Sequence, residues 1–335
     1  MRISIIIPAY NASHFLENTV QSVRSQTFKD WECVIIDDGS SDETLAVAQN
    51  LAASDPRLRV YHQENGGIAN ARNRGYTESC KESEFVIFLD HDDRWESDCL
   101  EVLLAALNAD PAACAAHGLA MAVDMDPQTF KLVQPHVKHR HRHIPTPKGT
   151  RTASLTEPTT FQMLIWDNCI TTTGVVLIRR TALDAAGPFD RTIEPLDDWD
   201  MYFRLATRAH LAFVDKVVIH WRMHASNTSH NKDLMNGATC AIRQKMLGRT
   251  DLRGDEVSCI RRRFRRMYRS EYRHDAIDMA AYSRRCLAMG RLMRGLAYFV
   301  GALRKYGQYL WMHVFWDDKL YGRPVPVRFA DRCED

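Results

Sequence analysis

Short aliphatic runs alternate with amphipathic stretches along the first part of the chain. The aliphatic runs lie at Ile3–Ile7, Glu32–Ile36, Leu58–Tyr61 and Phe85–Leu89, and helical periodicity appears at 14–25, after residue 41 and at 67–80. Strands that are apolar on both faces and are joined by helices indicate a parallel sheet covered on both sides. The pattern therefore predicts an α/β fold with a mostly parallel sheet flanked by helices.

The pattern changes twice towards the C-terminus. Five prolines lie among His, Arg and Lys residues in 125–160, which predicts a long, mobile loop. Regular structure is expected again at the strand Val175–Arg179, a helix around Trp199–Arg208 and the strand pair Leu211–Val214 and Val217–His220. Beyond about residue 235 the pattern is helical and rich in arginine. We therefore expect an α/β domain over residues 1–235 and a basic, mostly helical region over residues 236–335.

The composition favours a globular protein of the cytoplasm. Hydrophobic residues make up 45% of the chain, which is enough for a proper core. The nine cysteines are scattered and show no CxxC spacing, which argues against a disulfide framework or a zinc module and fits a reducing compartment. The N-terminal apolar run is too short for a signal peptide, and no apolar stretch reaches the ~18 residues of a membrane span.

The net charge of +2 conceals an uneven distribution. Residues 1–239 hold 23 Lys and Arg against 31 Asp and Glu (−8), whereas residues 240–335 hold 21 against 11 (+10). The basic part contains the run Arg261–Arg266 and the aromatic residues Trp311, Phe315 and Trp316. Such a segment either binds an anionic membrane surface, here the inner face of the cytoplasmic membrane, or packs its aromatics on the N-terminal domain or a second subunit.

Polar clusters follow three of the predicted strands. They occupy residues 8–11, 37–40 and 90–93. In open α/β sheets, ligands bind beyond the carboxyl ends of the strands. The three clusters therefore predict one ligand-binding crevice at this edge of the sheet.

The cluster Asp90-His91-Asp92 predicts a site for a hard divalent cation, Mn²⁺ or Mg²⁺. Such cations take carboxylate oxygens and fill their other positions with water and substrate phosphate. The alternative is an acidic turn or a helix cap, because strand ends are commonly polar.

The cluster Asp37–Ser40 and the segment around Arg72 are candidates for nucleotide binding. Carboxylates after a strand can accept hydrogen bonds from ribose or base, although an Asp-Gly turn with a capping serine explains Asp38 and Gly39 equally well. Gly67 precedes a helix whose N-terminus suits an anion, and Arg72 lies within reach of a diphosphate. The alternative is close helix–sheet packing, and neither a GxGxxG nor a Walker sequence is present.

Three acids open the helix that begins near Asp197. One acid in a first turn stabilises the helix dipole, but three exceed that need, and one of them, set by Trp199 against an apolar wall, could act as a general base. Arg222 and His224 follow a later strand and could serve the metal or the diphosphate, although a lone histidine is more often structural. The histidines at 136, 139, 141 and 143 match no closed zinc site, so we expect a solvated basic loop.

In this order, the motifs resemble those of the family 2 glycosyltransferases, which have the GT-A fold. The matching segments are Ile5–Asn11, Val34–Ser40, Asn65–Gly75, Phe88–Asp93, Gly187–Asp190, Asp198–Asp200 and His224–Asn227. The resemblance extends from residue 1 to about residue 230. The Gln-x-x-Arg-Trp motif of processive synthases is absent after Asp200, as are membrane spans.

The resemblance assigns roles to residues at the crevice. It implies that Asp198 is the catalytic base and that the metal is held by Asp92 and Asp90 with His224 nearby. Contact with the nucleotide is implied for Pro8, Tyr10, Asn11, Asp38, Gly39, Arg72 and Asp90. The donor and acceptor pocket is implied to involve Gly187, Phe189, Asp197, Trp199 and Arg222.

The expected function is inverting, metal-dependent transfer of a single sugar from a nucleoside-diphosphate sugar to an acceptor hydroxyl in cell-envelope biosynthesis. UDP is the default base, while dTDP and GDP stay open. The acceptor is a carbohydrate or a lipid-linked molecule; no nucleic acid is expected, and an oligomer is possible. The alternatives are a nucleotidyltransferase, although the Gly-rich basic loop after the first strand is missing, and a non-catalytic protein that binds nucleotide sugars or membranes.

Overall fold

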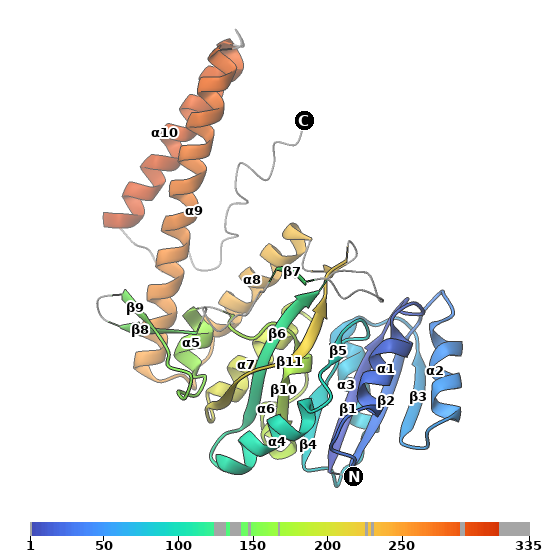
Figure 1. Cartoon of the computed structure of the whole chain (residues 1–335). Helices are drawn as coiled ribbons and strands as arrows, with labels where there is room; N and C mark the ends of the chain where they lie inside the picture. Colours follow the sequence, from blue (N-terminus) through green and yellow to red (C-terminus); the bar gives the residue numbers. More distant parts are fainter. Residues whose placement is uncertain are drawn as a thin grey trace. The chain divides into compact units, whose positions relative to one another are not determined.

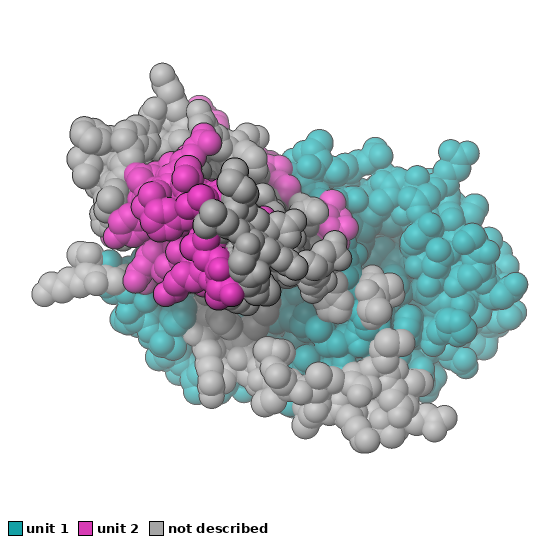
Figure 2. Space-filling view, turned by 90° about the horizontal axis from the view of Figure 1, so that it is seen from above, with its two compact units in different colours: residues 1–230 teal, residues 231–335 magenta. Residues whose placement is uncertain are grey.

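The computed structural model of the chain describes residues 2–123, 132–134, 142–146, 149–166, 168–224, 227–228, 231–288 and 292–314. The chain forms two compact units, residues 1–230 and 231–335, which Figure 2 shows in different colours. The sequence-based domain boundary between residues 235 and 236 stays a prediction.

The first unit is built on a large mixed sheet with the strand order β3-β2-β1-β4-β10-β6-β11-β5 (Figure 1). Strands β1 to β4 run parallel to one another, β6 and β11 are also parallel, and β10 lies antiparallel between β4 and β6. Their bounds are β1 Ile3–Ala9, β2 Trp31–Asp38, β3 Leu58–Gln63, β4 Phe85–Phe88, β5 Arg94–Trp95, β6 Ala115–Val123, β10 Val176–Arg179 and β11 Leu211–Arg222. The predicted α/β fold with a mostly parallel sheet is confirmed.

Helices pack against this sheet and against one another. Helix α3 contacts β1 and β2, α4 contacts β6, β10 and β11, and α7 contacts α5 and α6. Their bounds are α1 Leu16–Arg24, α2 Thr44–Ala53, α3 Ile68–Glu78, α4 Cys99–Ala109, α5 Phe161–Trp166, α6 Arg180–Ala186 and α7 Asp197–Ala206. A short 3-10 helix, Thr173–Val175, precedes β10.

The central strands form because their aliphatic residues are buried on both faces. Every residue of β1, β2 and β4 is buried, as expected for β-branched runs inside a covered parallel sheet. Gly75 lets α3 approach this sheet closely, because a Cβ at that position would lie 2.3 Å from Cγ2 of Ile6. The close approach brings Arg72, one turn earlier on α3, to the carboxyl ends of the strands.

The segment 125–160 contains regular structure that the sequence did not predict. The described residues there include β7 (Leu132–Gln134), which pairs with β6, and the two-stranded sheet of β8 (His143–Thr146) and β9 (Gly149–Thr152). Arg142 anchors this sheet, since its buried guanidinium donates to the carbonyl of Ser154 (3.1 Å) and lies 3.5 Å from the ring centroid of Phe213. Residues 125–131, 135–141, 147 and 148 of the expected loop lie outside the described residues.

Strand β11 also differs from the expectation. The two predicted strands, 211–214 and 217–220, form one strand with a register shift between Phe213 and Val217. Asp215 and Lys216 are exposed at this irregularity, which explains why the polar pair looked like a turn in the sequence.

The second unit is helical, as expected for the C-terminal extension. It contains α8 (Lys232–Leu247), α9 (Gly254–Ala288) and α10 (Leu292–Val314), and α10 packs along α9 as a helical hairpin (Figure 1). Among the described residues, no helix has both the length and the apolar character that crossing a bilayer requires.

Candidate active site at the strand ends

The polar clusters that follow β1, β2 and β4 lie together, because these strands are neighbours in the sheet. The ring Nδ1 of His91 lies 3.2 Å from the carbonyl oxygen of Pro8, which joins the first and third clusters. The backbone N–H of Asn11 donates to Oγ of Ser40 (3.0 Å), which joins the first and second. Tyr10 remains 47% exposed at this edge. The predicted crevice therefore has its three sequence clusters side by side.

Asp38 shapes the loop before α3. Its Oδ1 accepts a hydrogen bond from the backbone N–H of Gly66 (2.9 Å), and its Oδ2 accepts one from Gly67 (3.0 Å). Both Gly39 and Gly67 have a positive φ, +72° and +86°, which favours glycine. The turn interpretation thus accounts for Asp38 and Gly39, and their contact with a nucleotide stays a prediction.

Arg72 joins three distant parts of the chain. Its Nη1 donates to Oδ2 of Asp197 (2.7 Å) and its Nη2 donates to Oδ1 of Asp90 (2.8 Å), while the guanidinium lies 5.5 Å from the ring centroid of Phe189. Burial disfavours the charged form, but the charges of Asp197 and Asp90 outweigh it and raise the pKa of Arg72. A buried guanidinium is stable only when it is paired in this way. Contact between Arg72 and a diphosphate stays a prediction.

The two acids of the candidate metal motif face different partners. Asp90 accepts from Arg72 and also from the hydroxyl of Thr172 (3.2 Å), whereas Oδ2 of Asp92 lies 2.8 Å from Nε2 of His224. Burial raises the pKa of Asp92, but the hydrogen bond to His224 and the charges of His91 and His224 outweigh it and lower the pKa. Asp92 is therefore ionised at neutral pH.

Asp92 and His224 fit a shared divalent cation. Two neighbouring ligand atoms on an octahedral ion with bonds of ~2.1 Å lie about 3 Å apart, and the Oδ2–Nε2 distance is 2.8 Å. Within the described residues, no group of three His, Cys, Asp or Glu side chains surrounds a single point, so the protein would supply few ligands and leave the other positions to water and phosphate. The histidines at 136, 139 and 141, in the segment expected to be a solvated basic loop, lie outside those residues.

Asp93 is a structural residue that the sequence did not single out. Its buried carboxyl accepts from the backbone N–H of Arg222 (3.1 Å), and the hydroxyl oxygen of Thr172, which Asp90 also contacts, lies 3.1 Å from its other oxygen. Burial, together with the charges of Asp92 and Asp90, raises its pKa well above the usual range. Asp93 thus ties the end of β11 to the loop after β4, which places His224 beside Asp92.

Asp198, the predicted base, has a carboxyl whose pKa is raised, and its catalytic role stays a prediction. Burial and the charge of Asp197 raise its pKa to about 7, while Arg72 opposes the rise. Its Oδ1 accepts from the backbone N–H of Trp199 (2.6 Å), which fixes the carboxylate at the start of α7. Trp199 is itself held by a hydrogen bond from its indole N–H to the carbonyl of Leu164 (3.2 Å). A carboxylate with this pKa accepts a proton efficiently near neutral pH.

Glu194 occupies the helix N-terminus at which an external anion was expected. Its Oε1 accepts from the backbone N–H of Ala69 (2.8 Å), in the first turn of α3. A Cβ on Gly67 would lie 2.5 Å from Glu194 Oε2, so only glycine leaves room for the carboxylate. The anion at this helix end is therefore a side chain of the protein. No local sequence signal identifies it, because Glu194 lies far along the chain.

Aromatic packing positions the two predicted residues at the end of β11, Arg222 and His224. The ring of His224 stacks on that of Phe15, with 5.1 Å between the centroids and 17° between the planes. The guanidinium of Arg222 lies 5.0 Å from the centroid of the same ring. Phe15, which the sequence did not single out, therefore orients both side chains at the metal-side edge of the site.

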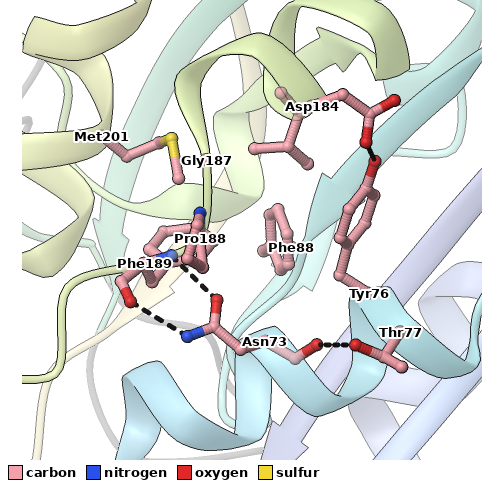
Figure 3. A pocket seen from close by; sticks show the side chains of 10 residues that line it. Asn73, Tyr76, Thr77, Phe88, Asp184, Gly187, Pro188, Phe189 and Met201 are labelled. Atoms are coloured by element: carbon pink, nitrogen blue, oxygen red, sulfur yellow. Dashed lines mark hydrogen bonds between the residues drawn. The ribbon is translucent and has the colours of Figure 1, made fainter.

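Gly187 and Phe189 line a largely apolar cavity of about 210 Å³ (Figure 3). Asn73 shapes its wall through two hydrogen bonds with the backbone of Phe189, of 2.8 and 2.9 Å. The ring of Phe189 lies beside both this cavity and Arg72. A role for Gly187 and Phe189 in donor or acceptor binding stays a prediction. The remaining cavity-lining residues are Tyr76, Thr77, Phe88, Leu183, Asp184, Pro188 and Met201.

The sequence of the first unit matches a known family. Residues 4–186 match the family described as Glycosyl transferase family 2. The chain belongs to this family. Its similarity to the putative teichuronic acid biosynthesis glycosyltransferase TuaG of Bacillus subtilis is 42% identity over 100 residues, which covers 30% of this chain and 39% of TuaG. The matches span only between 21% and 39% of the length of the curated relatives.

Solved structures share the fold of this family 2 chain at low sequence identity. S. aureus TarS 1–349 in complex with UDP-GlcNAc has a TM-score of 0.59 and 17% identity, covering 93% of this chain and 81% of that one. The mannosyltransferase PcManGT from Pyrobaculum calidifontis, in complex with GDP-Man and Mn²⁺, has a TM-score of 0.56 and 15% identity, covering 94% and 88%. The predicted GT-A fold is therefore confirmed.

Proposed function

We propose that the chain transfers a single sugar from a nucleoside-diphosphate sugar to an acceptor hydroxyl. The observation that carries the proposal is the bridge that Arg72 makes between Asp90 and Asp197, because it joins the candidate metal motif to the helix of the candidate base. Family membership supports the reaction class. A UDP-sugar donor is supported by the UDP-GlcNAc in TarS, while the GDP-Man in PcManGT keeps GDP as the alternative base.

In the proposed reaction, Asp198 accepts the proton of the acceptor hydroxyl. The hydroxyl oxygen forms a bond to C1 of the sugar, the bond between C1 and the phosphate oxygen breaks, and its electron pair leaves with the diphosphate. A single displacement of this kind inverts the anomeric centre. The role of Asp198 as the base is supported by its pKa of about 7, which lets the carboxylate take up a proton without being permanently protonated.

Asp92 and His224 are the proposed metal ligands, with Asp90 close by. When bound, a divalent cation stabilises the negative charge that grows on the departing diphosphate. A mixed carboxylate and imidazole set favours Mn²⁺ over Mg²⁺, which prefers oxygen ligands. The guanidinium of Arg72 holds Asp90 at 2.8 Å, so that this second acid keeps a fixed orientation.

The proposed setting is the biosynthesis of a cell-envelope polysaccharide or glycolipid in the cytoplasm, with a carbohydrate or lipid-linked acceptor. The support is that TuaG is described as a teichuronic acid biosynthesis glycosyltransferase. The thiols of Cys33, Cys80, Cys99, Cys114 and Cys259 form no disulfide, as in a reducing compartment.

The test is a panel of UDP-, dTDP- and GDP-sugars measured by thermal unfolding with Mn²⁺, followed by product analysis. A bound donor raises the free energy of unfolding by about 2.7 kcal/mol at one hundred times its Kd. Turnover must release a nucleoside diphosphate. Release of pyrophosphate would instead establish a nucleotidyltransferase, and stabilisation without turnover on any acceptor would indicate a binding protein.

A further inference from the structure

Among the described side chains where α9 and α10 pair, several small residues are buried and several large apolar residues are exposed. Ala276 and Ser283 of α9 and Ala302 of α10 are buried, at 5%, 1% and 6% exposure. Gly301 is packed as closely, because a Cβ there would lie 2.2 Å from Cε of Met279 on α9. A helical pair that is stable in water normally buries its large apolar side chains instead.

The large apolar residues of α10 form a continuous stripe on its outer face. Leu296, Phe299, Val300 and Leu303 are 45%, 49%, 63% and 58% exposed. Phe299 and Val300 each lie three or four residues from both Leu296 and Leu303, so the four residues lie along one face of the helix. Of the ten exposed large apolar residues in the described part of the chain, seven belong to α9 and α10. A contiguous apolar surface of this kind marks an interaction site.

The charge of this segment favours an anionic partner. Residues 279–316 contain six Lys and Arg residues and no Asp or Glu. Arg284 and Arg304 are exposed among them. A second copy of the same stripe would bring like charges together, whereas an anionic bilayer offers both an apolar interior and a negative surface. Small residues at a helix–helix seam with large apolar residues outside are also typical of helices in contact with lipid.

We propose that the outer face of α10 docks in the plane of an anionic membrane surface. Leu296, Phe299, Val300 and Leu303 enter the acyl boundary, and the basic residues contact lipid phosphate. The helix lies on the bilayer and does not cross it, in keeping with the finding that no described helix is apolar enough to span a membrane. The proposal does not depend on the transferase activity.

The test is co-sedimentation of the full chain with vesicles, without any sugar nucleotide. Vesicles containing phosphatidylglycerol should bind the chain at low salt, and binding should weaken at high salt. Vesicles of pure phosphatidylcholine should bind it at least tenfold less. Absence of binding to phosphatidylglycerol at low salt, or equal binding to both lipids, would overturn the proposal.

Variants of the stripe test whether vesicle binding depends on these residues or is nonspecific adsorption. Phe299→Glu combined with Leu303→Glu should lower the vesicle-bound partition coefficient at least tenfold, and Leu303→Gln should lower it less. Arg284→Gln and Arg304→Gln should each lower it about fivefold at low salt. The matched control is Leu155→Glu in the first unit, where the leucine is 52% exposed, and this change should have no effect.

Two measurements keep the outcome unambiguous. The variants should retain the helical circular dichroism and melting temperature of the parent chain. Light scattering after size exclusion, without lipid, should show the same mass for the parent chain and for Phe299→Glu/Leu303→Glu. A dimer that these substitutions split would overturn the proposal, because the occupant of the stripe would then be a second copy.

Discussion

Asp198 lies in the first turn of α7, where burial and the charge of Asp197 raise its pKa to about 7. If it is the base, Asp198→Asn should lower kcat by ~10²–10⁴ and leave donor binding intact. The matched control is Asp215→Asn, which removes an exposed carboxylate from β11 and should leave kcat unchanged. Turnover of Asp198→Asn at the parental rate would refute the assignment.

The pH dependence tests the same residue independently. Because the carboxylate form is the base, kcat/KM of the parent chain should rise with pH and level off above about 7, the pKa of Asp198. The effect on stability has the opposite sign. An unfolded Asp titrates near ~3.9, so between that pH and about 7 the folded state holds a proton that the unfolded state has lost, and stability falls as pH rises. Asp198→Asn should therefore raise the melting temperature at pH ~8 but not at low pH.

Asp197 tunes this base through its charge. It is among the causes that raise the pKa of Asp198, and its own partner is Arg72. Asp197→Asn should therefore shift the pH midpoint of kcat/KM downwards. The substitution should also lower the free energy of unfolding by about 1–3 kcal/mol, since one charged hydrogen bond of Arg72 is weakened while Asp90 still pairs with it. An unchanged or higher pH midpoint would contradict the tuning role.

His224 tests the proposed metal site. His224→Ala should raise the Mn²⁺ concentration required for half-maximal activity at least tenfold, and should weaken Mn²⁺-dependent thermal stabilisation, because it removes one of two adjacent ligand atoms. His220→Ala, on the strand that precedes His224, is the control, since His220 pairs with Glu96. Removal of metal with a chelator should abolish turnover, and Mn²⁺ should restore it. Full activity in the presence of chelator would exclude the metal role.

At the scale of elements, the sequence predicts most of the sheet because its core strands are continuous hydrophobic runs. The runs at β1, β2 and β4 are buried on both faces, so continuous hydrophobicity identifies them without tertiary context. For β11 the sequence predicts two strands, because an exposed polar pair such as Asp215-Lys216 is typical of a turn. Pairing of β7, β8 and β9 was missed because prolines suggest a loop and short strands gain their stability from partners elsewhere.

The candidate site also shows which features the sequence can predict and which it cannot. Motif residues that follow strands, such as Asp90 and Asp92, are visible in the sequence because strand ends converge. Contacts between distant elements are not visible: Arg72 with Asp197 and Glu194 with Ala69 each join residues 125 positions apart. Nor does the residue pattern, without the family resemblance, separate Asp92, beside His224, from Asp93, whose buried carboxyl accepts from the backbone N–H of Arg222.

The packing of α3 on the sheet should be measurable through Gly75. A Cβ there would lie 2.3 Å from Ile6, so Gly75→Ala should lower the free energy of unfolding by about 1–3 kcal/mol and reduce activity by moving Arg72. Gly237→Ala in α8 is the matched control, because nothing lies within 4 Å of its added Cβ and alanine favours a helix by ~1 kcal/mol. Urea unfolding measures both. Equal responses of the two variants would contradict the close approach of α3.

At the scale of the whole molecule, the chain divides its charge between its two units. Residues 1–230 hold 22 Lys and Arg against 30 Asp and Glu (−8), and residues 231–335 hold 22 against 12 (+10). The acidic unit contains the candidate metal and base residues, whereas the basic unit contains the exposed stripe of α10. This division predicts that a donor and a lipid surface act on different parts of the chain.

Hydrogen–deuterium exchange should resolve these two responses in one experiment. Donor with Mn²⁺ should slow exchange at the strand-end clusters 8–11, 37–40 and 90–93 and at the start of α7, because bound ligand suppresses local opening. Vesicles containing phosphatidylglycerol should slow exchange in α10, around Leu296–Leu303, because docking removes its outer face from water. The control is phosphatidylcholine vesicles, which should change neither region. Donor-induced protection confined to α10, or lipid-induced protection confined to the strand ends, would contradict this division of roles.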